Sequence, residues 1–117
     1  MQLVEQKCAP CAGNQAPLSN GEAGALLKQI PGWELADYGK FISKKYKFKD
    51  FKEALAFVNK VGEIAESEEH HPDIHLTDYR QVKINLSTHA IKGLSENDFI
   101  LAAKIDELPK DLKASKS

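Results

Sequence analysis

Three of the four histidines in this 117-residue chain lie within six positions of one another, and the fourth lies further along. The cluster holds His70, His71 and His75, and the fourth histidine is His89. An imidazole with an unperturbed pKa of about 6.5 can give or take a proton at neutral pH. The pattern therefore indicates proton-transfer chemistry, provided that the fold brings an acid and a base together.

The adjacent pair is constrained by the proline that follows it. Pro72 disfavours helical backbone at His71, so a helix running into this region should end by about His70. The pair then lies at a corner between a helix and a strand, where functional side chains are common. The structural alternative is a polar helix end whose histidines complement the helix dipole.

The fourth histidine follows a strongly alternating segment, residues 80–87, in which one set of positions is apolar. Those positions are Val82, Ile84 and Leu86. Continuing the alternation places His89 on the opposite, open face of the sheet. Gly93 and a helix cap follow, so a ligand could approach the N-terminus of a helix there. The structural alternative is an exposed histidine at the end of a strand.

A metal site is a competing interpretation. Cys8 and Cys11 have C-x2-C spacing, and His71 and His75 have the spacing of zinc ligands. Against zinc, the gap between the two pairs far exceeds the roughly 12–15 residues of a zinc finger. Pro72 also prevents the two histidines from being neighbours on a helix. A redox role for the cysteines has less support, because no strand leads into them. Two reduced cysteines in a leader are the simpler interpretation.

Capping patterns predict where three helices begin. Ser19, Asp50 and Ser95 are each followed by an acidic residue three positions later. Pro31-Gly32 stops the first helix. The second has apolar residues at intervals of three and four, so one of its faces should be buried.

Strand patterns fill the gaps between these helices. Strands are expected at 33–35, 41–48, 73–77 and 80–87, with hairpin turns at 37–40 and 78–79. The order is helix, strand, strand, helix, strand, strand, helix. It predicts an α+β fold: an antiparallel sheet with helices packed on one face and the other face open.

Composition limits the partners and the location. Hydrophobic residues make up 42% and charged residues 28%, with a formal charge of -1, which argues against nucleic-acid or anionic membrane partners. No apolar run approaches the roughly 20 residues of a membrane helix, and no signal-peptide pattern opens the chain, so a cytoplasmic protein is expected. We expect a flexible leader at 1–18, a domain at 19–108 and a frayed tail at 109–117.

Several segments together resemble the pterin-4a-carbinolamine dehydratase family. They are Glu69 to Pro72, Val82 to His89 and Gly93 to Asp98, with Pro31-Gly32-Trp33 and Phe48 to Phe51 as earlier landmarks. The similarity covers roughly residues 19–108. It implies a four-stranded antiparallel sheet with three helices packed on one face, in agreement with the order of elements above.

The resemblance also implies a reaction. Family members dehydrate 4a-hydroxytetrahydrobiopterin to quinonoid dihydropterin and water, which recycles the pterin after aromatic amino acid hydroxylation. No metal or redox cofactor is required. By motif, His70, His71 and His89 correspond to the catalytic histidines, whereas His75 does not. Substrate-binding positions carried over in the same way are Pro72, Thr88, Ala90, Ile91 and Asp98.

The resemblance further implies partners. Besides the pterin substrate, we expect a homodimer or homotetramer and a functional link to an aromatic amino acid hydroxylase. The alternative function is a non-catalytic one on the same fold, as a protein-binding dimerisation cofactor or an assembly factor. The three histidines and Asp98 favour the enzyme.

Overall fold

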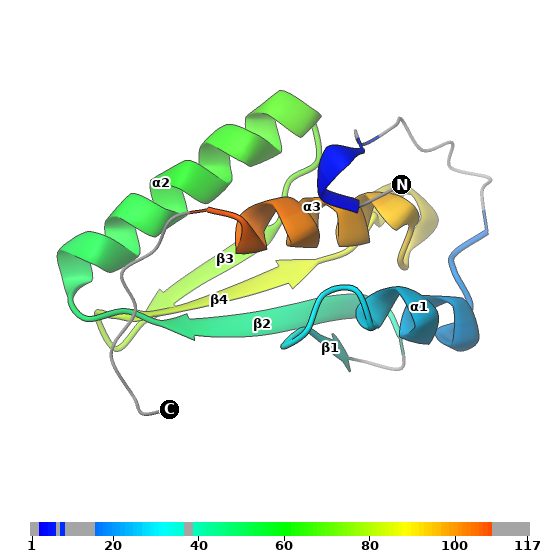
Figure 1. The fold of residues 1–117 in the computed structure, drawn as a ribbon, viewed down its shortest axis with the longest axis horizontal. Coiled ribbons are helices and arrows are strands. Elements are labelled where there is room, and N and C mark those ends of the chain that lie inside the picture. The colour runs from blue at the N-terminus through cyan, green and yellow to red at the C-terminus, as the bar shows by residue number, and fades with distance from the viewer. Residues whose placement is uncertain (1–2, 7, 9–15, 37–38, 109–117) are drawn as a thin grey trace.

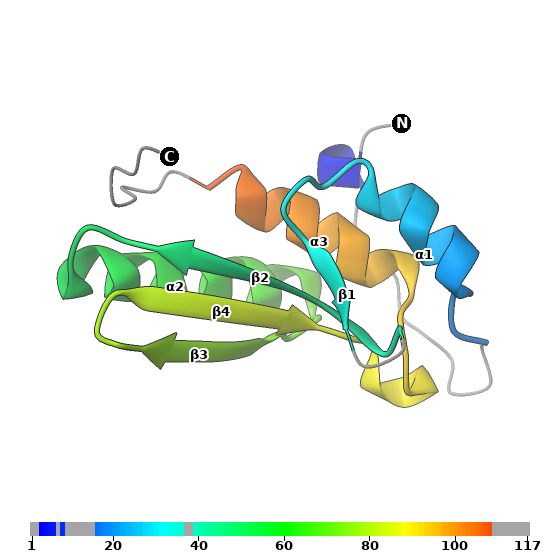
Figure 2. The same ribbon diagram turned by 90° about the horizontal axis from the view of Figure 1, so that it is seen from below.

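A computed structural model provides the structure of the chain and describes residues 3–6, 8, 16–36 and 39–108. Four strands form one antiparallel sheet in the order β1 (Glu34–Ala36), β2 (Phe41–Lys47), β4 (Gln81–Leu86), β3 (Asp73–Thr77) (Figure 1). The described helices are α1 (Asn20–Leu27), α2 (Phe51–Glu68) and α3 (Glu96–Asp106), with 3-10 turns η1 (Leu3–Glu5) and η2 (His89–Ile91). The helices lie on one side of the sheet, as Figure 2 shows. The predicted fold is confirmed.

The helices begin where their caps predict. Ser19 and Ser95 each form a capping box, and the side chain of Asp50 accepts a hydrogen bond from the backbone at the start of α2. Helix α2 ends at Glu68 and is followed by the C-cap Glu69, whose backbone is left-handed with φ of 56°. The chain therefore leaves the helix before Pro72, as the sequence predicts. Among the described residues, no helix has the length and apolarity needed to span a bilayer.

The alternation of β4 decides which face of the sheet is buried. Val82, Ile84 and Leu86 are fully buried, and their neighbours along the strand are partly exposed. Pairing on both sides keeps this register, with Ile42 of β2 opposite Leu86 and Ile74 of β3 opposite Ile84. A slip of one residue would turn the whole apolar set towards solvent, so the hydrophobic pattern fixes the register.

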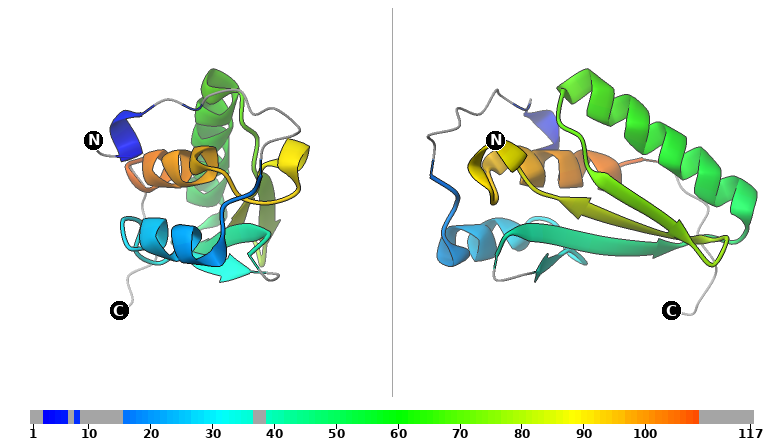
Figure 3. Two further views of the ribbon diagram at one scale, coloured as in Figure 1. Left: turned by 90° about the vertical axis from the view of Figure 1, so that its right-hand side faces the viewer. Right: turned by 180° about the vertical axis from the view of Figure 1, so that it is seen from behind.

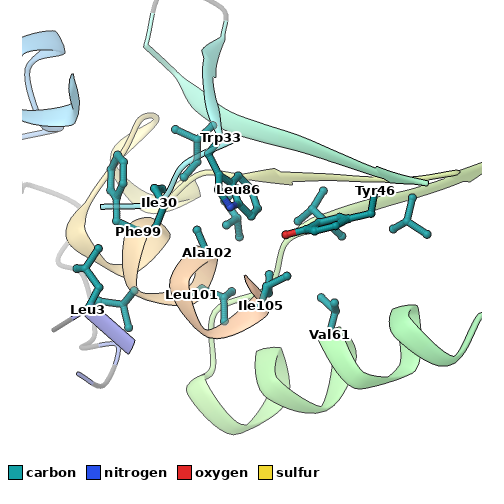
Figure 4. Packing of buried hydrophobic residues seen from close by; sticks show 14 of the residues in the cluster. Leu3, Ile30, Trp33, Tyr46, Val61, Leu86, Phe99, Leu101, Ala102 and Ile105 are labelled. Carbon is teal, nitrogen blue, oxygen red and sulfur yellow. The ribbon is translucent and has the colours of Figure 1, made fainter. Parts of the chain in front are cut away.

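An aromatic cluster joins the sheet to α2, and an acidic residue joins it to α3. The ring centroids of Tyr46 and Phe57 lie 4.8 Å apart. The Asp106 carboxylate accepts hydrogen bonds from Trp33 Nε1 at 3.0 Å, Lys44 Nζ at 3.0 Å and Tyr46 Oη at 2.5 Å. Burial, reinforced by Asp106, raises the pKa of the Tyr46 phenol well above its usual value. Because of this raised pKa, the hydroxyl stays protonated and donates to Asp106. Figure 4 shows Tyr46 between the sheet and the helices that carry Val61 and Ile105.

Part of the segment expected to be a flexible leader lies against the domain. The turn η1 contacts α3 (Figure 3). The side chain of Leu3 is buried in the same core cluster as the α3 side chains. The backbone N–H of Leu18 donates to the carbonyl of Leu94 at 2.8 Å. Cys11, the predicted turn residues Asp37 and Tyr38, and the expected tail at 109–117 lie outside the described residues.

Two phenylalanines on α2 provide a test of this packing. Phe57 is 1% exposed and Phe51 is 48% exposed. Phe57→Ala should lower the free energy of unfolding by about 3–5 kcal/mol, because it leaves a cavity beneath the sheet. Phe51→Ala should change it by about 0.5 kcal/mol or less. Urea unfolding of both variants measures the difference, and equal losses would contradict the packing.

Candidate active site

A fully buried carboxylate, that of Asp98, joins the ends of three elements. Its Oδ2 accepts from Thr88 Oγ1 at 2.9 Å and from the backbone N–H of Ser95 at 3.0 Å. Its Oδ1 lies 2.6 Å from Nε2 of His70. A buried carboxylate is costly unless it is hydrogen-bonded, and the N-terminus of a helix favours negative charge. Both conditions hold for Asp98 at the start of α3.

Thr88 and Ser95, which bond to Asp98, also help to close the base of the loop after β4. Thr88 and Gly93 pair as an isolated bridge, with the N–H of Thr88 donating to the carbonyl of Gly93 at 2.8 Å. Thr88 Oγ1 also lies 2.8 Å from Ser95 Oγ. A Cβ on Gly93 would come within 2.8 Å of Pro17 Cβ, so only glycine fits there without movement. The loop is thus held at both ends while its tip, η2, projects from the layers (Figure 2).

His89 is the first residue of η2 and is exposed. β4 ends at Leu86, so His89 lies in the loop after the strand, and the expectation that it faces the open side of the sheet stays a prediction. Ala90 is also exposed, whereas the side chain of Ile91 is buried. For Ile91, therefore, the backbone and not the side chain is suited to contact a ligand.

The adjacent histidines have different environments. The side chain of His70 is 11% exposed and lies against Asp98. The side chain of His71 is 61% exposed, with Nε2 2.5 Å from Oε2 of Glu66 in open solvent. The Asp98 carboxylate next to Nε2 of His70 favours the imidazole tautomer with its proton on Nε2. Nδ1 of His70 is then left as an acceptor. One histidine is therefore fixed and the other is accessible.

The remaining predicted positions separate from one another. Pro72 is half-buried just before β3, and His75 is exposed on β3 opposite Lys83 of β4. The side chain of Thr88 is buried and its hydroxyl bonds within the protein. The structure thus joins His70, Thr88 and Asp98 through direct contacts. His71 and His89 are exposed, and each follows one of these residues in the sequence.

A second set of contacts, around Cys8 and Glu68, was not predicted from the sequence. The backbone N–H of Cys8 donates to Oε1 of Glu68 at 2.8 Å, and Cys8 Sγ lies 3.6 Å from the carbonyl oxygen of Asn97. Nζ of Lys104 lies 3.6 Å from Oε2 of Glu68. No local pattern signals these contacts, because Glu68 reads as one acidic residue among several at a polar helix end.

These surroundings bear on the zinc interpretation. Burial, with the negative charges of Glu68 and Asp98, raises the pKa of the Cys8 thiol to about 12. A thiol must lose its proton to bind zinc, so this site opposes that step. Within the described part of the chain, no three or more His, Cys, Asp or Glu side chains are grouped to hold a metal ion.

Two threonines test the closure of the loop. Thr88→Val keeps the shape of the side chain but removes the hydroxyl that Asp98 and Ser95 use, and it should lower the free energy of unfolding by about 1–3 kcal/mol. Thr77→Val, at an exposed position on β3, is the matched control and should change it by about 0.5 kcal/mol or less. Urea unfolding compares them. A Thr88 variant as stable as the control would show that the hydroxyl contributes nothing.

Comparison with known proteins places this chain in a family. The family described as pterin 4 alpha carbinolamine dehydratase matches residues 16–108, which include the whole domain expected at 19–108. A Halorhodospira halophila protein named "putative pterin-4-alpha-carbinolamine dehydratase" is 47% identical over 108 residues, covering 92% of this chain and 98% of that protein. A Nitrosomonas eutropha protein of the same name is 49% identical over 107 residues, covering 91% and 92% respectively.

Solved structures show the same fold. A transcriptional coactivator/pterin dehydratase from Brucella melitensis has a TM-score of 0.72 at 32% identity, covering 77% of this chain and 95% of that chain. A pterin dehydratase-like RuBisCO assembly factor of the α-carboxysome has a TM-score of 0.55 at 22% identity, covering 64% and 86%. The second likeness concerns the fold alone. With a family match over residues 16–108 and relatives at almost half identity, the chain belongs to the pterin 4 alpha carbinolamine dehydratase family.

Proposed function

We propose that this protein dehydrates 4a-hydroxytetrahydrobiopterin to quinonoid dihydropterin and water by general acid–base catalysis. The observation that carries the proposal is the contact between His70 and the buried Asp98, beside the loop that presents His89. Family membership supports the same reaction. In the cell, this step would follow aromatic amino acid hydroxylation and return the pterin for reuse.

The chemistry needs two proton transfers. The substrate carries a hydroxyl on C4a next to N5–H. The C4a–O bond breaks as a proton reaches the departing hydroxyl. The lone pair of N5 forms the C4a=N5 double bond, and the proton on N5 leaves. Positioned acid and base groups contribute about 10²–10⁴-fold to such steps. The balance requires no oxidant or reductant.

His70 and His89 share the acid and base work in this proposal, and His71 orients the pterin. Asp98 favours the His70 tautomer with its proton on Nε2, so Nδ1 is ready to accept the proton from N5. His89 is exposed and can exchange protons with water, which suits delivery to the leaving hydroxyl. Pro72, Ala90 and the Ile91 backbone would line the pterin, with Thr88 and Asp98 acting from behind His70.

A protein-binding role on the same fold is the second candidate. Phe51 and Leu55 lie one helical turn apart on α2 and are 48% and 41% exposed, which offers apolar area to a partner. The Brucella melitensis relative is described as both a coactivator and a dehydratase, so the two roles are compatible. Self-association as a dimer or tetramer would use such surfaces as well.

Stopped-flow measurement of 4a-hydroxytetrahydrobiopterin dehydration tests the catalytic proposal. The protein should accelerate the reaction over buffer, and His70→Ala and His89→Ala should each lower kcat by about 10²-fold or more. His75→Ala is the matched control: it changes an exposed histidine on β3 and should keep full activity.

Two results would contradict this assignment. If the folded His89→Ala variant kept the full rate, His89 would have no catalytic role. If the unmodified protein gave no acceleration, the enzyme proposal would fail and the protein-binding role would become the better explanation.

A further inference from the structure

Glu68 ends α2 two residues before His70, and its side chain is only 7% exposed. Its carboxylate receives the Cys8 backbone N–H at Oε1 and faces Lys104 of α3 at Oε2. The residue therefore touches both the N-terminal segment and α3.

This acidic residue occupies a costly position. A carboxylate in the last turn of a helix opposes the helix dipole, and burial disfavours its charge. A second buried carboxylate, Asp98, lies close enough that both acids raise the pKa of the Cys8 thiol. The Lys104 ammonium and the Cys8 N–H offset these costs by holding the Glu68 carboxylate from two directions.

The contacts of Cys8 join the same two parts of the chain as the contact between His70 and Asp98. Its N–H bonds to Glu68, two residues before His70, and its Sγ lies against the carbonyl of Asn97, one residue before Asp98. One residue thus bridges the same two chain segments that the imidazole and the carboxylate bridge directly. Burial of Leu3 against α3 anchors the segment that carries Cys8.

The chain between Glu68 and His70 has a demanding conformation. Glu69 has a positive φ of 56°, a left-handed backbone conformation that is unfavourable for a residue with a side chain. The His70 N–H donates to the Ala65 carbonyl at 3.1 Å, which closes the helix end. Such a turn persists when its surroundings fix it from both sides, and Glu68 supplies the side facing α3.

We propose that Glu68 is a positioning residue that, with the N-terminal segment carrying Cys8, holds the end of α2 so that His70 meets Asp98. This inference rests on the proposed function, because it assigns Glu68 a part in the acid–base chemistry of His70. Glu68 does not touch the pterin. It fixes the direction in which the chain leaves the helix.

The experiment compares Glu68→Ala and Glu68→Gln with Glu63→Ala, a change at an exposed position of the same helix. Glu68→Ala should lower kcat by about 10-fold or more with KM changed by about twofold or less, because misplaced catalytic groups lose rate rather than binding. Glu68→Gln keeps an oxygen for the Cys8 N–H and should recover most of kcat. Glu63→Ala should match the unmodified protein.

NMR of the His70 ring gives a readout that does not depend on activity. The proton shared between Nε2 and Asp98 should give a downfield signal protected from exchange, which His70→Ala identifies by its loss. Glu68→Ala should weaken or shift this signal, and Glu63→Ala should not. If the unmodified protein fails to dehydrate the pterin, the proposed function falls, and the ring signal still decides whether Glu68 positions His70.

An unchanged signal and an unchanged kcat in folded Glu68→Ala would overturn the proposal, even if the variant were less stable. If Glu68→Ala does not fold, Leu3→Ala replaces it, because it loosens the segment that carries the Cys8 N–H. A reduced His70 signal in Leu3→Ala supports the proposal. An unchanged signal overturns it.

Discussion

The buried carboxylate of Asp98 is the constraint on which the rest of the structure depends. Removed from water, it must receive hydrogen bonds, and three parts of the chain supply them: the helix cap at Ser95, Thr88 in the segment after β4, and His70 after α2. The same interactions that begin α3 also close the loop carrying His89 and orient the imidazole. Folding and the proposed chemistry therefore use the same atoms.

Features set by short stretches of sequence were predictable. The caps at Ser19, Asp50 and Ser95 and the alternation of β4 depend on neighbours within a few residues, and the structure has them where expected. The contact between His70 and Asp98 spans 28 positions, and only the family resemblance brought both residues to the site. Residue patterns alone gave an adjacent histidine pair with two interpretations.

Features set by tertiary packing were not predictable. The pairing of Thr88 with Gly93, which closes the loop after β4, is not encoded in the alternation of the strand. Packing of Leu3 on α3 and burial of Glu68 also lack local signals, since each depends on surfaces that form only when distant segments meet. These are the contacts that distinguish the N-terminal segment from a simple leader.

If Asp98 holds His70 ready for proton transfer, as proposed, the dehydration rate of Asp98→Asn should reveal it. Asparagine keeps the size of the side chain but loses the charge and one of the two acceptors. Asp98→Asn should still fold, as judged by cooperative unfolding, and should have a kcat lower by about 10-fold or more, whereas Asp73→Asn, at an exposed position on β3, should keep the full rate. If folded Asp98→Asn dehydrates the pterin as fast as the unmodified protein, Asp98 does not hold His70 for proton transfer.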